Sequence, residues 1–166
     1  MAPPDTAMTA HSFSVPADQR YFEDYPPGAV YEFGATTVSE DELVSFARSY
    51  DPQSFHIDRA AAAESMFGGL IASGWHTASL TMRMLVDHYL STVASLASPG
   101  VDELRWLAPV RPADVLRVRV TVTDARRSRS RADRGVVTSY IEVMNQNDVV
   151  VMTVKAVNLL LTRPAA

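Results

Sequence analysis

The sequence predicts a single α+β domain in which one antiparallel sheet wraps around a long central helix. Helical patterns fall in the first half of the chain and strand patterns fill the second half, which is typical of the α+β class. The chain has 166 residues, 47% of them hydrophobic, enough for one sizeable core. We therefore expect a partly mobile tail and lead-in over residues 1–27 and one domain over residues 28–166.

The lead-in and the first strand precede any helix. Pro3-Pro4 and Pro26-Pro27 interrupt residues 1–27, which show no sustained hydrophobic period, so about the first ten residues are expected to be a mobile tail. Residues 30–38 are rich in β-branched and aromatic side chains and predict a strand.

A capping box predicts the first helix. Ser39 is followed three residues later by Glu42, and apolar residues then recur at helical spacing. We expect a helix over residues 40–49, which Pro52 stops. Residues 51–56 are then expected to form a loop.

Two further helices complete the first half. Asp58 is expected to cap a short helix over residues 60–66, and Gly68-Gly69 ends it. After a turn at Ser73-Gly74, residues 75–94 carry apolar side chains densely enough to predict a long, buried helix.

The second half predicts an antiparallel meander. A turn at residues 98–100 closes the helical half, and the alternation of apolar and polar residues is clearest over residues 116–122. The strands are expected over residues 102–107, 115–124, 136–145 and 149–161.

Composition argues against several functional classes. The absence of cysteine excludes disulfides, thiolate metal sites and a cysteine nucleophile. A net charge of −4 argues against a nucleic-acid partner for the whole domain. No stretch is long and apolar enough to span a membrane, and the N-terminus lacks the pattern of a secretory signal. We expect a cytoplasmic protein that binds neither nucleic acid nor membrane.

The first candidate for chemistry is the pair Asp51 and His56. A carboxylate and an imidazole that reach one water can add it across an activated double bond, one taking a proton from the water and the other giving a proton to carbon. The alternative is structural, with Asp51 as a helix-end residue and His56 as a histidine whose hydrogen bonds are satisfied in a loop.

The second candidate is Gly74, at the expected N-terminus of the long helix. Free backbone N–H groups and the positive end of the helix dipole can stabilise an enolate oxygen there. A glycine also lets a substrate approach the backbone. The alternative is an ordinary flexible turn before a helix.

Together these segments resemble the MaoC-like hydratases, the (R)-specific enoyl-CoA hydratase branch of the hot dog fold superfamily. The family pattern is Gly-Asp-x-Asn-Pro-aliphatic-His-x-Asp, an alanine-rich helix, and an Ile-(Ala/Val)-His-Gly-Met turn. Asp51 and His56 match its acidic residue and histidine, and Gly74 follows His56 by the family's eighteen residues. Residues 104–114 are similar to the family's Phe-x-x-Pro-Val-x-x-Gly-Asp segment, so the resemblance covers about residues 30–161.

The resemblance implies a hot dog domain that adds water to an enoyl thioester, or removes it from an (R)-3-hydroxyacyl thioester. By position, Asp51 and His56 would activate the water and move the proton, and the Gly74 N–H would polarise the thioester carbonyl. The substrate would be carried by CoA or an acyl carrier protein, and no metal or redox cofactor is expected. Two hot dog units pair edge to edge in this superfamily, so we expect a homodimer or a larger homo-oligomer.

Several residues depart from the family pattern. Gln53 stands where the family usually has Asn, Ser54 where it has Pro, Tyr50 where it has Gly or Glu, Ser73 where it often has His, and Trp75 where it has Met. These positions tune the pocket more than they transfer protons. The departures therefore bear on substrate identity.

Aromatic bulk is expected near the site. We expect Gln53, Phe55, Ser73, Trp75 and Trp106 to contact the substrate. Together with Phe67, the three aromatic residues suggest a short, branched or aromatic acyl group. The alternative is that these side chains are plain core.

Other residues are less informative. The five arginines of the run 126–134 indicate either a solvated hairpin tip or a docking surface for the phosphates of a thioester carrier. His76 is expected to be a structural hydrogen-bonding residue, and His88 to lie in the core or an interface. Without a Cys pair or a Glu-x-x-His spacing, no metal site is expected.

Two alternative functions remain open. A hot dog thioesterase would direct water at the thioester carbonyl rather than at Cβ, and the close Asp51 and His56 pair argues against it. A non-catalytic acyl-CoA-binding subunit would account for the altered neighbours of Asp51.

Overall fold

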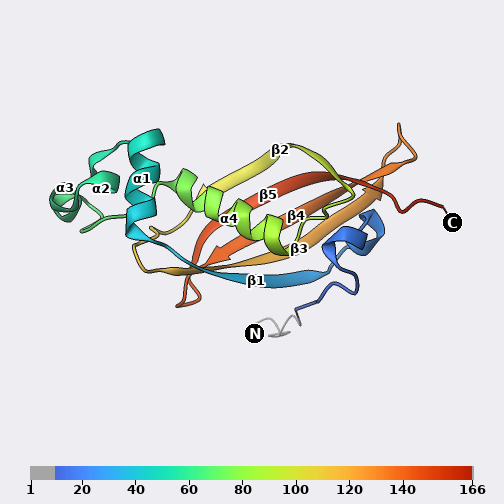
Figure 1. The fold of residues 1–166 in the computed structure, drawn as a ribbon, viewed down its shortest axis with the longest axis horizontal. Helices are drawn as coiled ribbons and strands as arrows, with labels where there is room; N and C mark the ends of the chain where they lie inside the picture. Colours follow the sequence, from blue (N-terminus) through green and yellow to red (C-terminus); the bar gives the residue numbers. More distant parts are fainter. Residues whose placement is uncertain (1–9, 166) are drawn as a thin grey trace, which may run out of the picture.

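The structure is a computed structural model that describes residues 10–165. Within them, one antiparallel sheet has the strand order β1-β3-β4-β5-β2 (Figure 1). The mobility expected of the tail concerns mainly residues 1–9, which lie outside the described residues. The strands are β1 (Val30–Thr37), β2 (Ser95–Trp106), β3 (Val115–Arg127), β4 (Arg134–Met144) and β5 (Val150–Leu161).

The helices lie in two places. α1 (Glu40–Tyr50), α2 (Ser54–Ile57) and α3 (Arg59–Glu64) gather at one end of the sheet, and α4 (Gly74–His88) lies across one face of it (Figure 1). Two 3-10 turns, η1 (Ala17–Gln19) and η2 (Phe22–Asp24), lie at the other end. The α+β architecture expected from the sequence is confirmed.

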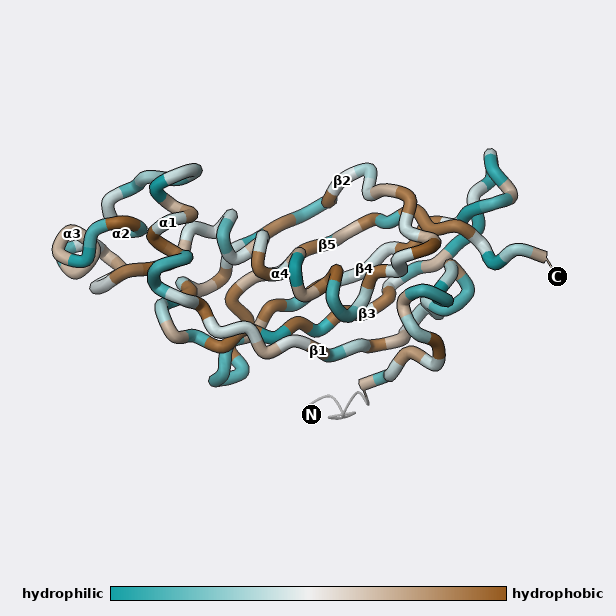
Figure 2. The backbone as a smooth tube through the Cα atoms, viewed as in Figure 1, coloured by the Kyte–Doolittle hydropathy of each residue, from teal (hydrophilic) through white to brown (hydrophobic). Residues whose placement is uncertain are grey.

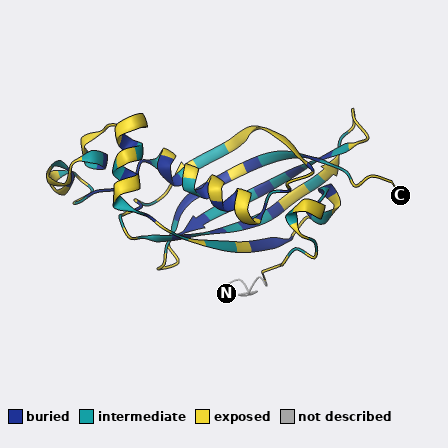
Figure 3. Cartoon of the chain, viewed as in Figure 1, coloured by how far each residue is buried: buried dark blue, intermediate teal, exposed yellow. Residues whose placement is uncertain are grey.

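The core lies between α4 and the sheet. In β3, Leu116, Val118, Val120 and Val122 are fully buried and belong to the same apolar cluster as Met84 of α4. The intervening residues face the other side of the sheet, so the strand alternates between buried and partly exposed positions (Figures 2 and 3). This is the period-two pattern of a half-buried antiparallel strand.

Helix α4 is buried on one face only, which corrects the expectation of a fully buried helix. Met84 is 2% exposed, whereas Met82 and Val86 on the opposite face are 48% and 46% exposed (Figure 3). The reason is that the sheet covers one side of the helix and no described segment covers the other. His88 is exposed, with its ring tilted against that of Phe33, so it does not lie in the core of this chain, and its expected place in an interface stays a prediction.

Helix α4 also ends earlier than residue 94. The Arg20 guanidinium donates hydrogen bonds to the carbonyls of Tyr89 (2.8 Å) and His88 (3.3 Å), which satisfy the helix C-terminus. The Ser91 hydroxyl then accepts a hydrogen bond from the Ala94 N–H (2.8 Å) and turns the chain toward β2. Arg20 lies in the lead-in and Ser91 in the loop after the helix. The apolar pattern of the helix therefore could not predict where the helix ends.

Strand β2 begins earlier than expected. The sequence predicted a turn at residues 98–100, but β2 runs through them and pairs with β5, with a register shift between Ala97 and Gly100. The Ser98 hydroxyl donates to the Val157 carbonyl (2.6 Å) across this irregular stretch. The residues that suggested a turn therefore form a bulged part of an edge strand.

The helix caps lie where the sequence predicts them, but one segment expected to be a loop is partly helical. The Ser39 hydroxyl accepts from the Glu42 N–H at the start of α1, and the Asp58 carboxylate accepts from the first N–H groups of α3. The loop expected over residues 51–56 is instead partly helical, because α2 forms one turn closed by the bond from the Asp58 N–H to the Ser54 carbonyl (2.9 Å). A four-residue helix is too short to show a hydrophobic period.

The lead-in packs against the sheet. Tyr25 is 1% exposed and its hydroxyl donates to the Tyr89 carbonyl (2.9 Å). The Phe22 ring lies directly against Gly135 of β4, in the space that a Cβ there would occupy. The lead-in therefore covers the end of the sheet that the helices leave open.

Gly135→Ala should lower the free energy of unfolding by about 1–3 kcal/mol, because the new methyl group would overlap the Phe22 ring. Urea denaturation measures this loss. In a Phe22→Ala background the same substitution should be much less destabilising, since the ring is gone. Equal losses in both backgrounds would contradict this packing.

Candidate active site

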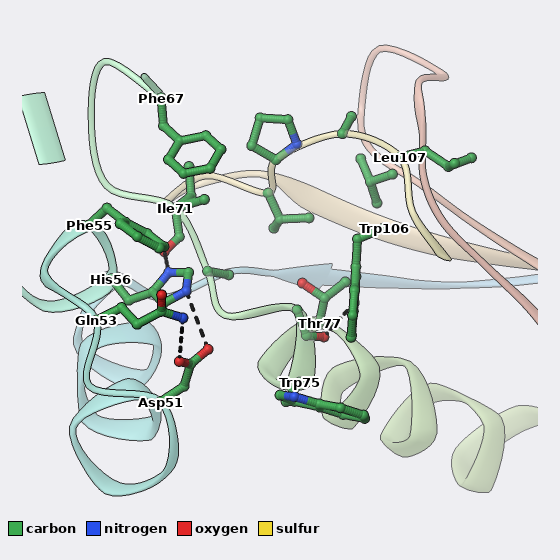
Figure 4. A pocket seen from close by; sticks show the side chains of 16 residues that line it. Asp51, Gln53, Phe55, His56, Phe67, Ile71, Trp75, Thr77, Trp106 and Leu107 are labelled. Carbon is green, nitrogen blue, oxygen red and sulfur yellow. Dashed lines mark hydrogen bonds and ion pairs between the residues drawn. The ribbon is translucent and has the colours of Figure 1, made fainter. Parts of the chain in front are cut away.

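A cavity of about 500 Å³ lies where α1 and α2 meet the N-terminus of α4 and the end of β2 (Figure 4). Among the residues expected from the sequence, Ser73 lies behind the wall and contacts Asp51. The others line the cavity: Asp51, Gln53, Phe55, His56, Gly74, Trp75 and Trp106.

Asp51 and His56 are paired in the cavity wall. The His56 Nε2 lies 3.3 Å from the Asp51 Oδ2 (Figure 4), and the ring is buried. The His56 Nδ1 lies 2.8 Å from the Ile71 carbonyl oxygen. Because a carbonyl can only accept, Nδ1 carries a hydrogen, so the Nε2 of the neutral ring is an acceptor. Two acceptors, one on each side chain, therefore face the same space.

Hydrogen bonds hold Asp51 in its ionised form. The Ser73 hydroxyl donates to Oδ2 (2.7 Å), and the Gln53 amide donates to Oδ1 (2.7 Å). These two bonds, Ser73 first, hold the pKa of the Asp51 carboxyl below its usual value. The carboxylate therefore stays ionised to lower pH than an ordinary aspartate.

Local structure brings this pair together. Helix α1 ends at Tyr50. The N–H of the next residue, Asp51, still bonds the Ala47 carbonyl (2.8 Å), and Pro52 prevents continuation. The single turn of α2 then returns His56 toward Asp51. The Ile71 N–H bonds the Phe55 carbonyl (3.3 Å), and this contact places the segment before α4 beside α2.

Gly74 is the first residue of α4, so its N–H has no acceptor within the helix. The Ser73 hydroxyl accepts from the Trp75 N–H (3.3 Å), and no hydrogen bond among residues 10–165 uses the Gly74 N–H. Gly74 lines the cavity, and its N–H lies at the positive end of the helix dipole. It can therefore stabilise negative charge on an oxygen held there.

Trp106 supplies a reason for glycine at position 74 that the sequence did not show. A Cβ at Gly74 would overlap the Trp106 indole, whose Nε1–H donates to the Gly74 carbonyl (2.9 Å). The Trp75 ring meets the same indole edge to face, with centroids 5.2 Å apart. Glycine is thus required by packing as well as by access to the backbone.

Sequence reasoning missed several residues of the cavity. Thr77 is buried and lines it one turn after Gly74, a spacing that could have pointed to this residue. Val110 and Val151 form an apolar wall from segments distant in sequence, and no local signal marks them.

Other candidate residues lie elsewhere. His76 is buried and stacks on Phe46, and it does not line the cavity. The arginine run forms the β3–β4 hairpin at the end of the sheet opposite α1–α3 (Figure 1), where Arg127 pairs with Glu23 (2.8 Å). No helix in the described part of the chain is long and apolar enough to cross a membrane.

Comparison with known proteins gives consistent matches. The family model for the MaoC like domain matches residues 23–146. The MaoC-like dehydratase from Rhodospirillum rubrum, of known crystal structure, is 39% identical, with a TM-score of 0.82 over 88% of this chain and 99% of that chain. A 3-hydroxybutyryl-CoA dehydratase of Methylorubrum extorquens is 32% identical over 117 residues, 68% of this chain and 69% of the relative.

A further solved structure extends the comparison. The (R)-hydratase from A. caviae involved in PHA biosynthesis is 25% identical, with a TM-score of 0.65 over 84% of this chain and 97% of that chain. Structural similarity extends to proteins described as having the hot dog fold. The family match spans most of the chain and includes the residues of the cavity that precede position 147. This chain therefore has the hot dog fold and belongs to the MaoC-like dehydratase family.

Proposed function

We propose that the protein adds water to an enoyl thioester to give an (R)-3-hydroxyacyl thioester, or catalyses the reverse dehydration. The observation that carries the proposal is the Asp51 and His56 pair, 3.3 Å apart, in one cavity with the Gly74 N–H. Membership of a dehydratase family and similarity to an (R)-hydratase support it. The carrier is CoA or an acyl carrier protein.

The geometry fits one water molecule between two bases. A water has two O–H groups, so it can donate one to the His56 Nε2 and one to the Asp51 carboxylate, which directs an oxygen lone pair at Cβ. As the C–O bond forms, one of the bases takes a proton from the water. Negative charge then develops on the thioester oxygen.

The Gly74 N–H stabilises that charge, and such a donor is typically worth about 3–4 kcal/mol in the transition state. The pair then delivers a proton to Cα, so that the elements of water are added across the double bond. Dehydration follows the same steps in reverse. These steps use protein groups alone, so the proposal includes no metal or redox cofactor.

Asp51→Asn and His56→Ala should each lower kcat for crotonyl-CoA hydration by about 10²–10⁴-fold, because each removes one of the bases that act on the water. Loss of enoyl thioester absorbance, followed in EDTA, measures turnover. Asp41→Asn and His88→Ala change exposed residues away from the cavity and should keep full activity. Near-normal turnover in either cavity variant would contradict the mechanism.

The product distinguishes the alternative functions. Chiral chromatography should show the (R)-3-hydroxybutyryl thioester, and the (S) product would contradict the stereochemistry. Release of free thiol from a saturated acyl-CoA would instead indicate a thioesterase. Binding of enoyl-CoA without turnover would indicate a non-catalytic subunit.

Ser73→Ala should move the acid limb of the kcat/KM profile to higher pH. The Ser73 hydroxyl stabilises the Asp51 carboxylate, so its removal raises the Asp51 pKa toward the ordinary value, and the base is protonated at a higher pH. Ser79→Ala is a matched control, because that exposed hydroxyl of the same helix bonds the Trp75 carbonyl. An unshifted acid limb in Ser73→Ala would refute the assignment of Asp51 as the base.

We also propose that the protein forms a homodimer through the edge of β2. This strand is at the end of the sheet order, and Val101 on it is 53% exposed. Leu107 beyond its end is 56% exposed, and Met82 of α4 is 48% exposed. Pairing two copies along this edge would cover an unpaired strand and these apolar side chains.

Sedimentation equilibrium should therefore give at least twice the mass of one chain. Val101→Glu should shift the protein toward monomer, because a charge would be buried at the interface. Val149→Glu, at a valine in the β4–β5 turn that is 45% exposed, should leave the mass unchanged. A monomeric wild-type protein would rule out this assembly.

A further inference from the structure

A second, apolar groove begins where the active-site cavity ends. It has a volume of about 210 Å³ and lies between α4 and strands β2, β4 and β5. Its walls are largely apolar and include Met82, Leu85, Leu104, Ile141 and Met152. Such a groove could bury the hydrocarbon tail of a long acyl chain.

The cavity and the groove meet on three elements. On α4 and on β5, one residue lines the cavity and the next residue in sequence lines the groove. On β2 the cavity residue and the groove residue are two apart, on the same side of the strand. The pairs, cavity residue first, are Thr77 and Ala78, Trp106 and Leu104, and Val151 and Met152.

Trp106 is the cavity residue of β2 nearest to the groove, because Leu104, two residues earlier on the same side of the strand, lines the groove. In Figure 4 its indole lies between the side of the cavity that holds His56 and the later turns of α4. The ring is fixed by its bond to the Gly74 carbonyl (2.9 Å), by contact with Gly74 and by the edge of Trp75. These three contacts hold the indole, which is 46% exposed, against the first turn of α4.

The opposite end of the cavity offers no comparable space. The rings of Phe55 and Phe67 pack there with centroids 5.2 Å apart. Beyond them the chain reaches solvent, since the neighbouring Met66 is 92% exposed. On the side of Trp106, by contrast, the elements that line the cavity go on to line the apolar groove.

We propose that Trp106 determines substrate specificity by closing the groove, so that the enzyme accepts short acyl thioesters and excludes long straight ones. This inference rests on the proposed function, because it places the acyl group in the same cavity. The thioester carbonyl sits at the Gly74 N–H, and the acyl chain extends from it until it meets the indole.

Trp106→Ala should open the cavity to the groove and raise the ratio of kcat/KM for octenoyl-CoA to that for crotonyl-CoA by about tenfold or more. Each methylene group that becomes buried contributes about a fourfold gain in binding. Trp106→Phe keeps an aromatic wall without the N–H and should keep the wild-type preference for crotonyl-CoA. Circular dichroism checks that each variant is folded.

Ala78→Phe provides the matched test of the groove. On the Trp106→Ala background it refills the space and should remove the gain with octenoyl-CoA. On the wild-type background it should leave crotonyl-CoA turnover unchanged. A gain that survives this refilling would overturn the proposal, since the long chain would then lie elsewhere.

Binding separates this inference from the proposed reaction. Calorimetry with butyryl-CoA and octanoyl-CoA, which cannot be hydrated, should show that the wild-type protein prefers the shorter chain and that Trp106→Ala reverses or removes the preference. Equal wild-type affinity, or an unchanged ratio in Trp106→Ala, would overturn the role of Trp106. The expected binding pattern without turnover of any enoyl-CoA would support Trp106 and refute the hydratase proposal.

Discussion

The packing of one face of α4 against the sheet is the constraint on which the site depends. Met84 on this face is 2% exposed and joins the apolar cluster of β3, so the helix cannot rotate without exposing it. Arg20 binds the carbonyls at the far end of the helix, and Ser73 caps the near end. With both ends held, the Gly74 N–H has a fixed direction relative to the cavity, which is what a preorganised oxyanion donor needs.

Ser73 connects the two halves of the proposed chemistry. Its hydroxyl donates to Asp51 (2.7 Å) and accepts from the Trp75 N–H (3.3 Å), and the residue is fully buried. One side chain thus sets the position of the carboxylate relative to the helix that carries the oxyanion donor. The sequence predicts Ser73 as a substrate contact, whereas in the structure it lies behind Asp51 and donates to its carboxylate.

Local signals predicted much of this fold, and long-range contacts decided the rest. The caps at Ser39 and Asp58 and the alternation in β3 involve neighbours in sequence, and the structure confirms them. The end of α4 depends on Arg20, so the sequence predicts a helix that is too long. The start of β2 depends on the Val157 carbonyl, so the sequence predicts a turn where the structure has a strand. In the site, residue type and spacing, together with the resemblance to a known family, pointed to Asp51, His56 and Gly74. They could not show the Ile71 carbonyl that sets the tautomer of His56.

Gly74 illustrates why a motif glycine is ambiguous evidence for catalysis. Two constraints act on it at once, since the Trp106 indole occupies the space of a Cβ and the residue itself lines the cavity. Any side chain at this position displaces the indole before it alters the oxyanion donor, so a loss of activity in Gly74→Ala would combine a packing effect with a chemical one. The packing effect is removed where Trp106 has first been made small. Because alanine keeps the backbone N–H, a remaining loss of kcat would then come from the methyl group, which obstructs the approach of the substrate oxygen to that donor.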